Sequence, residues 1–525
     1  MLPFPDVVKD ACKNVYAGRI DGSKGEDDAF AHATDCSIKV LRLDWLVGIV
    51  NELLSESSFI SALPCAIFLD METLWKDASR LVRKFSVALL SFVWSILCIA
   101  GEAKAPSPFR SGERIVLLGD SITKNGKYIY FLQLFEELRH PGRGVSFLNA
   151  GISGDRVDSG RERLDWDVLP LKPDRVIVMF GMNDVKLALW EGSMPDAAEQ
   201  DARDKAVSGF RRELERLTDG LATAGVRCDL ATPPPYDQYD AASKAVCRAN
   251  GNEPGLARLA EVVRQIAAER GLGLVDVHRP LTDILKSHPE LGLLRGDRIH
   301  PWWEGHLLLA VQYLEAMGED GEVGRIELTA SAAKRGFCYA PKRLPFPRLD
   351  VFWRNMERTV ETAYPFEERF NREILVVKGL PAGRYAILAD GREFASFDAA
   401  ELAHGVNIAT CDTPSQRCAQ AAAKTMIELM TLETTFRDVP YMARTERSVK
   451  DLDKWLKSLE KNPHHAYYAS CVKSYREQKE RTSETYAQGA ALRARLSKEA
   501  RAMPWMISIR RQPGDEQCKQ ETKGE

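Results

Sequence analysis

The feature that most constrains the fold of this 525-residue chain is an apolar run, Ile115 to Leu118, that ends in the turn Gly119-Asp-Ser121. Four consecutive aliphatic residues are typical of a strand that is covered on both faces, as in a parallel sheet. Gly119 allows a sharp turn where the strand ends. Ligands of open α/β sheets bind at the carboxyl ends of the strands, and Ser121 is predicted to lie at such an end.

Further apolar segments alternate with helical patterns along the chain. Strands are predicted near residues 114–118, 145–149, 175–180, 227–231 and 273–277. Helices are predicted near residues 127–139, 204–224 and 254–270. Alternating strands and helices indicate an α/β domain in which a parallel sheet carries helices on both faces.

Three more polar motifs follow a strand or open a helix in the same region. They are Asn149-Ala-Gly-Ile-Ser-Gly-Asp155, Gly181-Met-Asn-Asp184 and Gly296-Asp-Arg-Ile-His-Pro301. Together with the Gly-Asp-Ser turn, and in this order, they resemble the SGNH (GDSL-type) hydrolase family, whose name comes from the Ser, Gly, Asn and His of four such blocks. The resemblance covers roughly residues 112–318. It implies a flavodoxin-like three-layer α/β/α domain that acts as a serine esterase.

The residue types in these motifs also fit a serine nucleophile on chemical grounds. His300 is the best candidate for the base that takes the proton of the Ser121 hydroxyl, because imidazole titrates near neutral pH. Asp297 can orient that imidazole through its other ring nitrogen. The backbone N–H groups of Ser121 and Gly154 and the side-chain amide of Asn183 are the expected oxyanion donors. This chemistry requires no cofactor and no metal.

Each of these residues, taken alone, also has a structural interpretation. Ser121 could cap a helix, His300 could be a surface residue, and Asp297 could form a turn. Asn183 could cap the segment after the third strand, and Gly154 could be an ordinary loop glycine. The joint occurrence of a nucleophile, a base, an orienting acid and oxyanion donors favours the catalytic interpretation.

Three neighbouring residues are less certain in role. Arg156 stands where relatives often carry a small hydroxyl residue, so it either reaches into the cleft or points to solvent. His306 is interpreted as a packing residue, since residues six apart on a helix do not share a face. The segment Thr232-Pro-Pro-Pro-Tyr236 cannot be helical and is expected to form a wall of the cleft, where Tyr236 either meets substrate or packs.

The N-terminal third contains a segment typical of a signal peptide. Residues 85–100 carry no charge and follow a basic stretch that ends at Lys84. Ala103-Lys-Ala105 offers a small-x-small cleavage site, which predicts a mature chain beginning near Pro106. The apolar run is shorter than the roughly 20 residues of a membrane span, and an uncleaved signal anchor is the alternative.

The sequence changes in character after residue 319. Between Glu373 and Phe397, short apolar runs are separated by Pro-Ala-Gly and Asp-Gly, which predicts a small antiparallel sheet of hairpins. The stretch Phe397–Ala409 is similar to a C-terminal module that accompanies bacterial SGNH hydrolases of uncharacterised specificity. A structural role is expected for this C-terminal part, and shielding or extending the active-site cleft is the alternative.

The chain is therefore expected to have several parts. They are an N-terminal extension without an evident role (1–70), a signal peptide or signal anchor (71–105), the hydrolase domain (106–318), a small β-rich module (319–412) and a helical region with a polar tail (413–525), in which residues 510–525 are predicted to be disordered.

The composition mainly argues against certain partners, metal sites and disulfides. The formal net charge is −3 and the basic residues are dispersed, so no nucleic-acid partner is expected. The sequence has no zinc-ligand spacing. Among its eleven cysteines, Cys411 and Cys418 could pair, but two free thiols fit equally well, so no disulfide is predicted.

The resemblance and the signal segment together predict an exported serine esterase that works through an acyl-enzyme. The leading substrate class is a small-molecule or carbohydrate ester, with O-acetyl groups on carbohydrate first. A lipid esterase, lysophospholipase or thioesterase is the alternative among enzymes, and a non-catalytic carbohydrate-binding protein on the same fold is the alternative outside them. Contact with a membrane is expected only through an uncleaved signal anchor, and the sequence gives no indication of oligomeric state.

Overall fold

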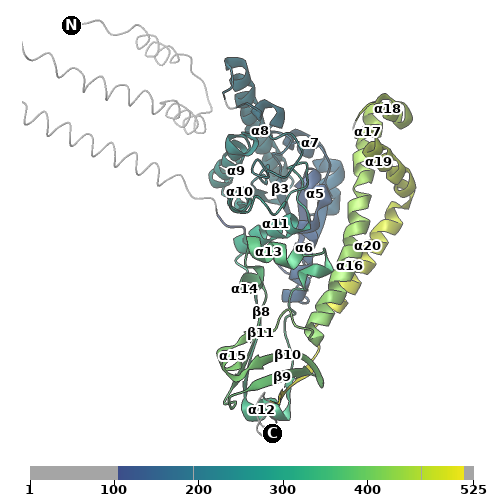
Figure 1. The fold of residues 1–525 in the computed structure, drawn as a ribbon. Coiled ribbons are helices and arrows are strands. Elements are labelled where there is room, and N and C mark those ends of the chain that lie inside the picture. The colour runs from purple at the N-terminus through teal and green to yellow at the C-terminus, as the bar shows by residue number, and fades with distance from the viewer. Residues whose placement is uncertain (1–103, 193, 463, 514–525) are drawn as a thin grey trace, which may run out of the picture. The chain divides into compact units, whose positions relative to one another are not determined.

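The structure, a computed structural model, describes residues 104–192, 194–462 and 464–513, all of which belong to one unit (Figure 1). The predicted N-terminal extension and the signal segment up to residue 103 lie outside the described residues. Among the described residues, none of the helices combines the length and hydrophobicity that a membrane span requires.

A five-stranded parallel sheet in the order β2-β1-β3-β4-β5 forms the centre of the first domain. Its strands are β1 (Arg114–Gly119), β2 (Ser146–Gly151), β3 (Arg175–Met179), β4 (Arg227–Ala231) and β5 (Gly273–Val275). All five lie close to their predicted positions. The strand order is that of flavodoxin-like folds, which confirms the predicted fold class.

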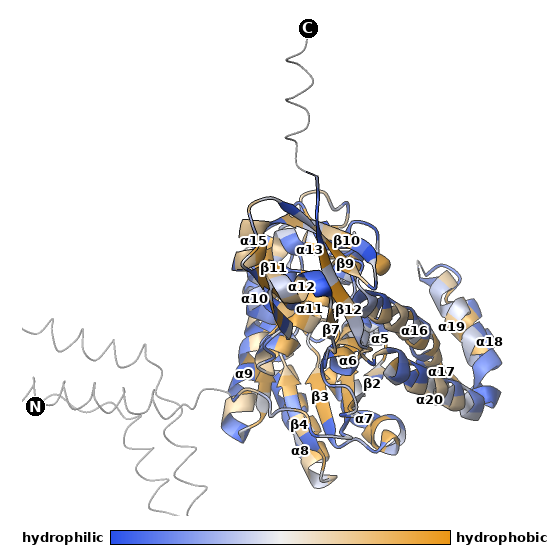
Figure 2. Ribbon diagram, turned by 90° about the horizontal axis from the view of Figure 1, so that it is seen from below, coloured by the Kyte–Doolittle hydropathy of each residue, from blue (hydrophilic) through white to orange (hydrophobic). Residues whose placement is uncertain are grey.

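Helices cover both faces of this sheet. They are α5 (Ser121–Asn125), α6 (Lys127–Arg139), α7 (Val157–Glu162), α8 (Ala197–Thr223), α9 (Ala257–Arg270), α10 (His278–Ser287) and α11 (Trp303–Ala316). Helices α6 and α11 pack together on one face, and α7, α8 and α9 pack on the other (Figure 1). The strands between them form the hydrophobic centre in Figure 2.

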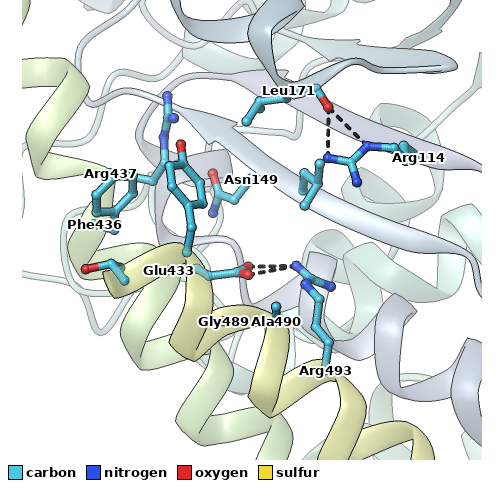
Figure 3. Close-up of a pocket in the computed structure, with 12 residues that line it drawn as sticks. Arg114, Asn149, Leu171, Glu433, Phe436, Arg437, Gly489, Ala490 and Arg493 are labelled. Carbon is cyan, nitrogen blue, oxygen red and sulfur yellow. Dashed lines mark hydrogen bonds and ion pairs between the residues drawn. The ribbon is translucent and has the colours of Figure 1, made fainter. Parts of the chain in front are cut away.

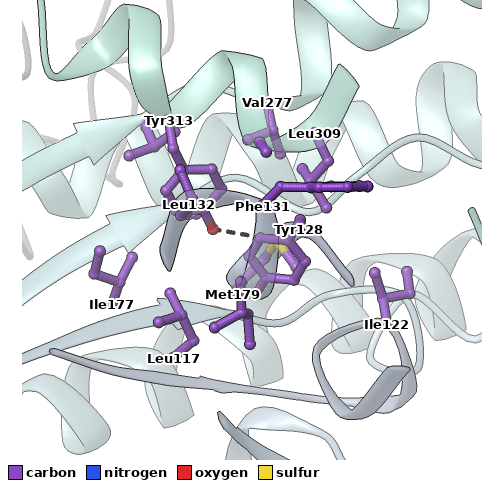
Figure 4. Packing of buried hydrophobic residues seen from close by; sticks show 14 of the residues in the cluster. Leu117, Ile122, Tyr128, Phe131, Leu132, Ile177, Met179, Val277, Leu309 and Tyr313 are labelled. Carbon is purple, nitrogen blue, oxygen red and sulfur yellow. Dashed lines mark hydrogen bonds between the residues drawn. The ribbon is translucent and has the colours of Figure 1, made fainter. Parts of the chain in front are cut away.

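The core explains why the first apolar run becomes β1. Ile115 to Leu118 are at most 1% exposed, because helices cover both sides of the strand. On one side, Tyr128 and Phe131 of α6 and Tyr313 of α11 pack towards the sheet (Figure 4). Each buried aliphatic side chain of this kind contributes about 1.5–3 kcal/mol to folding.

A β-rich module follows the first domain. Its strands are β6 (Glu322–Thr329), β7 (Phe337–Tyr339), β8 (Arg372–Lys378), β9 (Arg384–Ala389), β10 (Arg392–Asp398), β11 (Val406–Asn407) and β12 (Trp505–Arg511). Its helices are α12 (Ala330–Arg335) and α15 (Ala399–His404), whereas the buried residues of α13 (Met356–Ala363) and α14 (Phe366–Phe370) belong to the core of the first domain. The strands form two sheets, β10-β9-β12-β7 and β11-β8-β6. The six cysteines in the described part of the chain, Cys411 and Cys418 included, are free thiols.

The prediction of hairpins in this module is only half right. Strands β9 and β10 form the expected antiparallel hairpin around Asp390 and Gly391. The turn near Pro381, however, joins strands of two different sheets, and β8 pairs in parallel with β6. The reason is that β12 takes the place beside β9 that β8 would occupy in a hairpin.

Strand β12 corrects the prediction of a helical region with a polar tail from residue 510. Trp505, Ile507 and Ile509 are buried and alternate with more exposed residues, as in a strand with one covered face. Arg510 and Arg511 continue the pairing with β9. Their polar side chains do not prevent this, because the pairing uses backbone groups.

The helices between β11 and β12 form what we call the helical arm. They are α16 (Pro414–Phe436), α17 (Asp438–Val449), α18 (Leu452–Ser458), α19 (His465–Gln478) and α20 (Thr482–Glu499). Met426 and Leu429 of α16 and Leu496 of α20 belong to the same buried cluster as the central sheet. The arm is thus joined to the first domain by a continuous core.

The arm also covers the edge strand β2. Arg493 of α20 donates a hydrogen bond to the carbonyl of Phe147 at 3.0 Å and pairs with Glu433 of α16 at 2.8 Å. A small cavity of about 210 Å³ lies between these helices and the strand, and Figure 3 shows its lining. Covering an edge strand in this way prevents its pairing with other chains.

The position of β12 leads to a stability prediction. Trp505 is 3% exposed, lies against Tyr339 and Phe394, and donates its indole N–H to the Ser415 hydroxyl at 3.1 Å. Trp505→Ala should therefore lower the free energy of unfolding by about 3–5 kcal/mol in urea denaturation. Met506→Ala is the matched control, since the neighbouring side chain is 42% exposed, and its effect should stay within about 0.5 kcal/mol. Equal effects of the two variants would contradict the placement of β12.

Candidate active site

Ser121 lies where β1 passes into helix α5. Asp120 is the N-cap of this short helix, and its carboxylate accepts a hydrogen bond from the N–H of Ile122 at 2.9 Å. Ser121 is the first residue of the helix, so its backbone N–H has no partner within the helix. Within the described residues this N–H donates no hydrogen bond and remains available to a ligand.

His300 and Asp297 meet Ser121 as the sequence predicted. The Nε2 atom of His300 lies 2.8 Å from the Oγ atom of Ser121, and its Nδ1 atom lies 2.7 Å from Oδ2 of Asp297. Burial alone would raise the pKa of the Asp297 carboxyl, but hydrogen bonds from the His300 ring and from backbone N–H groups lower it to about 2. The acid is therefore a carboxylate at neutral pH and fixes the proton of the imidazole on Nδ1.

The loop that carries His300 is held from the segment after β4. Arg298 is buried with a left-handed backbone at φ 65°, and its guanidinium donates hydrogen bonds to the carbonyls of Asp237, Ser243 and Ala245. Tyr236, in the predicted cleft wall, is fully buried and donates its hydroxyl to a backbone carbonyl at 3.0 Å. Of its two predicted roles, Tyr236 thus has the packing one.

Gly154 and Asn183 lie in the same pocket as Ser121 and His300, which has a volume of about 710 Å³. Gly154 has φ 79°, and the space where a Cβ atom would lie is open for 4 Å. The Asn183 amide donates one hydrogen bond to the carbonyl of Asp155 at 2.8 Å, which orients it. A primary amide has a second N–H, so Asn183 can still donate to a ligand.

The other two residues whose roles the sequence left open, Arg156 and His306, do not line this pocket. Arg156 pairs with Asp158 at 2.6 Å, and its side chain is half exposed to solvent. His306 is fully buried, its ring is stacked on that of Tyr128, and burial lowers its pKa well below the usual value. Its packing interpretation agrees with this position.

Two buried carboxyl groups near the site were not predicted to matter. Burial raises the pKa of Asp120 to about 6 and that of Asp184 to about 7. Asp184 accepts the N–H of Val157 at 3.1 Å through one oxygen. Asp184 is therefore partly protonated near neutral pH, whereas Asp120 is still mostly a carboxylate.

The helical arm contributes a wall of the pocket that the sequence analysis missed. The residues from the arm are Met430, Thr434, Thr435, Asp438, His464, Tyr467 and Tyr468. Tyr467 donates its hydroxyl to the Ser153 hydroxyl at 2.9 Å, and Lys124 pairs with Asp438. The arm therefore extends the site, which was the less favoured expectation. No local motif marks these residues, and the contacts of Tyr467 and Asp438 are with partners about 300 residues away in the sequence.

A buried ionic network ties the arm to the loop that carries Gly154. Arg437 donates to both oxygens of Asp167 at 2.9 and 2.6 Å and to the carbonyl of Gly151 at 3.1 Å. Asp155 in this loop accepts hydrogen bonds from Arg163 and from Arg444 of the arm, both at 2.8 Å. Burial would raise the pKa of Asp167, but the two arginines beside it lower the value overall.

Comparison with known proteins agrees with this arrangement. Residues 117–308 match the model of the GDSL-like lipase/acylhydrolase family. The chain is 28% identical over 232 residues to an acetylxylan esterase of Geobacillus stearothermophilus. This alignment covers 40% of this chain and 95% of the esterase. The chain is also 36% identical over 104 residues to an uncharacterized lipoprotein of Bacillus subtilis (strain 168). That alignment covers 19% of this chain and 42% of the lipoprotein.

A solved structure is similar over a larger part of the chain. A gut microbial diltiazem-metabolizing enzyme aligns with a TM-score of 0.68 and 25% identity, over 78% of this chain and all of that one. The domain that contains Ser121 thus belongs to the GDSL, or SGNH, hydrolase family. The protein is an ester-hydrolysing enzyme.

The buried network generates a second prediction. Arg437→Met should lower the free energy of unfolding by about 3–5 kcal/mol, because it leaves Asp167 buried with one cation fewer. Arg476→Met is the matched control, since Arg476 pairs with Asp453 on the surface of the arm, and it should cost less than about 1 kcal/mol. Urea denaturation of both variants measures the difference. A small loss in Arg437→Met would show that the arm does not depend on this contact.

Proposed function

We propose that this enzyme cleaves carboxylic esters through an acyl-enzyme on Ser121. The observation that supports this most directly is the chain of hydrogen bonds from the Ser121 hydroxyl through His300 to Asp297, at 2.8 and 2.7 Å. In this proposal Ser121 is the nucleophile, His300 is the general base and acid, and Asp297 orients the imidazole.

The reaction then proceeds in two halves. As the Ser121 oxygen attacks the ester carbonyl carbon, its proton moves to Nε2 of His300, and the carbonyl oxygen becomes negatively charged. The tetrahedral intermediate collapses when the C–O bond to the alcohol breaks and the alcohol oxygen takes the proton from His300. A water molecule then loses a proton to His300, attacks the acyl group, and releases the acid and the free Ser121 hydroxyl.

The charge that develops on the carbonyl oxygen needs fixed donors. The N–H groups of Ser121 and Gly154 and the Asn183 amide line the pocket beside the nucleophile. Preorganised donors of this kind stabilise the oxyanion without reorganisation during the reaction.

The substrate class we favour is an O-acetylated carbohydrate. The acetylxylan esterase of Geobacillus stearothermophilus aligns over nearly its full length. Of the described residues that line the pocket, Met430 is the single aliphatic one, whereas Tyr467, Tyr468 and many polar groups surround it. Such a lining suits a short acyl group on a polar alcohol, because few aliphatic side chains are present to bind a long lipid chain.

We also infer that the enzyme is exported. The signal-like segment before residue 106 and the similarity to a bacterial lipoprotein both support this inference. An exported location would give the site access to extracellular carbohydrate. The proposed partner is thus a small-molecule or carbohydrate ester.

Substitution of the nucleophile tests the proposed mechanism. Ser121→Ala should abolish hydrolysis of p-nitrophenyl esters, since no other hydroxyl takes its place next to His300, while the thermal melting temperature stays close to that of the wild type. A fluorophosphonate probe should label the wild type alone, and labelling of the variant would refute the assignment. With the wild type, activity on acetate that falls steeply with acyl length supports deacetylation, whereas a long-chain preference would favour a lipid esterase.

The role of Asn183 gives a separate prediction. Loss of one oxyanion donor costs a factor of about 10² to 10³ in kcat, so Asn183→Ala should lower kcat far more than it raises KM. Steady-state kinetics on p-nitrophenyl acetate measures both constants. An effect confined to KM would make Asn183 a substrate-binding residue instead.

A further inference from the structure

The lining of the Ser121 pocket contains more positively charged side chains than carboxylates. Its lining contains the cations Lys124, Lys127 and Arg295 and the carboxylates Asp297 and Asp438. Lys124 forms an ion pair with Asp438, and Asp297 is engaged by His300. Within the described part of the chain, Lys127 and Arg295 form no ion pair, and the lining contains one more cation than carboxylates.

Lys127 carries a positive charge without an ion-pair partner among the described residues although its side chain is half buried, which is unusual. Its ammonium group donates to the side-chain oxygen of Asn125 and lies 5.1 Å from the ring centre of Trp303. Burial, and then the charge of Arg295, lower its pKa to about 8, so it is still mostly protonated at neutral pH. A neutral amide and an aromatic face compensate only part of the cost of removing an ammonium from water.

Arg295 is held close to the base. Its backbone N–H donates to the carbonyl of His300 at 2.7 Å, so both residues belong to one loop. Its guanidinium lies 4.8 Å from the ring centre of Trp302, which limits its orientations. A planar guanidinium can bind both oxygens of a carboxylate at once.

We propose that the alcohol part of the substrate carries a carboxylate, which Lys127 and Arg295 bind beside the nucleophile. This inference rests on the proposed esterase function and narrows it to esters of acidic sugars, such as acetylated uronic acids. The positive charges of Lys127 and Arg295 complement the negative charge of the carboxylate. Their aromatic neighbours Trp303 and Trp302 hold the two side chains in place. The ester bond remains at Ser121, while the carboxylate fixes the sugar relative to it.

A matched pair of substrates tests this directly. Methyl glucopyranosiduronic acid and methyl glucopyranoside, each acetylated at the same hydroxyl, differ only in the carboxylate. The wild type should show a kcat/KM roughly 10- to 100-fold higher for the uronide, which is the usual range for a charge-assisted hydrogen bond. Added salt should reduce this ratio, because it screens exposed charges.

Variants then locate the origin of the preference. The double variant Lys127→Met and Arg295→Met removes both charges, retains an unbranched side chain at each position, and should bring the ratio close to one. Lys424→Met is the matched control, since this exposed lysine of α16 lies away from the pocket, and it should keep the wild-type ratio. Lys127→Met should also not lower the melting temperature, because it removes a half-buried unpaired charge. A clear loss of stability would indicate a structural role and count against the proposal.

Binding without turnover distinguishes a failure of the proposed carboxylate site from a failure of the proposed esterase function. Isothermal titration of the Ser121→Ala variant with both acetylated sugars should give tighter binding of the uronide, and the added methionine substitutions should remove the difference. Tight uronide binding without hydrolysis by the wild type would refute the esterase proposal and leave the carboxylate site standing. Hydrolysis or binding without preference for the uronide, or a preference that survives in the double variant, would overturn the carboxylate site.

Discussion

The geometry of the site depends on the ion pairs that one carboxylate, that of Asp167, forms with two arginines. Arg163 of the first domain and Arg437 of the arm both bind it, and all three groups are buried. Arg163 also donates to the carbonyls of Gly119 and Ala150, at the ends of the strands that precede Ser121 and the Gly154 loop. Because buried charges are stable only when fully paired, these elements and the arm must adopt their positions together.

The catalytic part of the site could be predicted from the sequence because each motif is local. An apolar run identifies each strand, and the parallel sheet brings the strand ends to one edge, where Ser121, Gly154 and Asn183 lie. The contribution of the arm could not be predicted in this way. Arg437 looks like any charged residue of a helix, and only the fold shows that it is buried. For β12, the alternation of Trp505 with later isoleucines was a signal that the polar end of the chain obscured.

The pocket extends well beyond the part of the chain that matches the family. The family match ends at residue 308, whereas the lining continues to Tyr468 of the arm. The residues proposed as nucleophile, base and oxyanion donors come from the domain that matches the family, and a second wall comes from the arm, outside that match. The proposed chemistry and this wall of the pocket are therefore encoded in separate stretches of the sequence, as is common when function is carried by sites on a widely used fold.

The last strand of the described chain occupies an interior place in its sheet, between β9 and β7. During synthesis, the residues of β9 and β7 leave the ribosome long before those of β12. Until β12 emerges, β7 has no partner in that sheet and β9 keeps one edge open, and such open edges can pair with other chains. Completion of this sheet therefore has to wait for β12, and a chain truncated before Trp505 would lack the strand that joins β7 to β9.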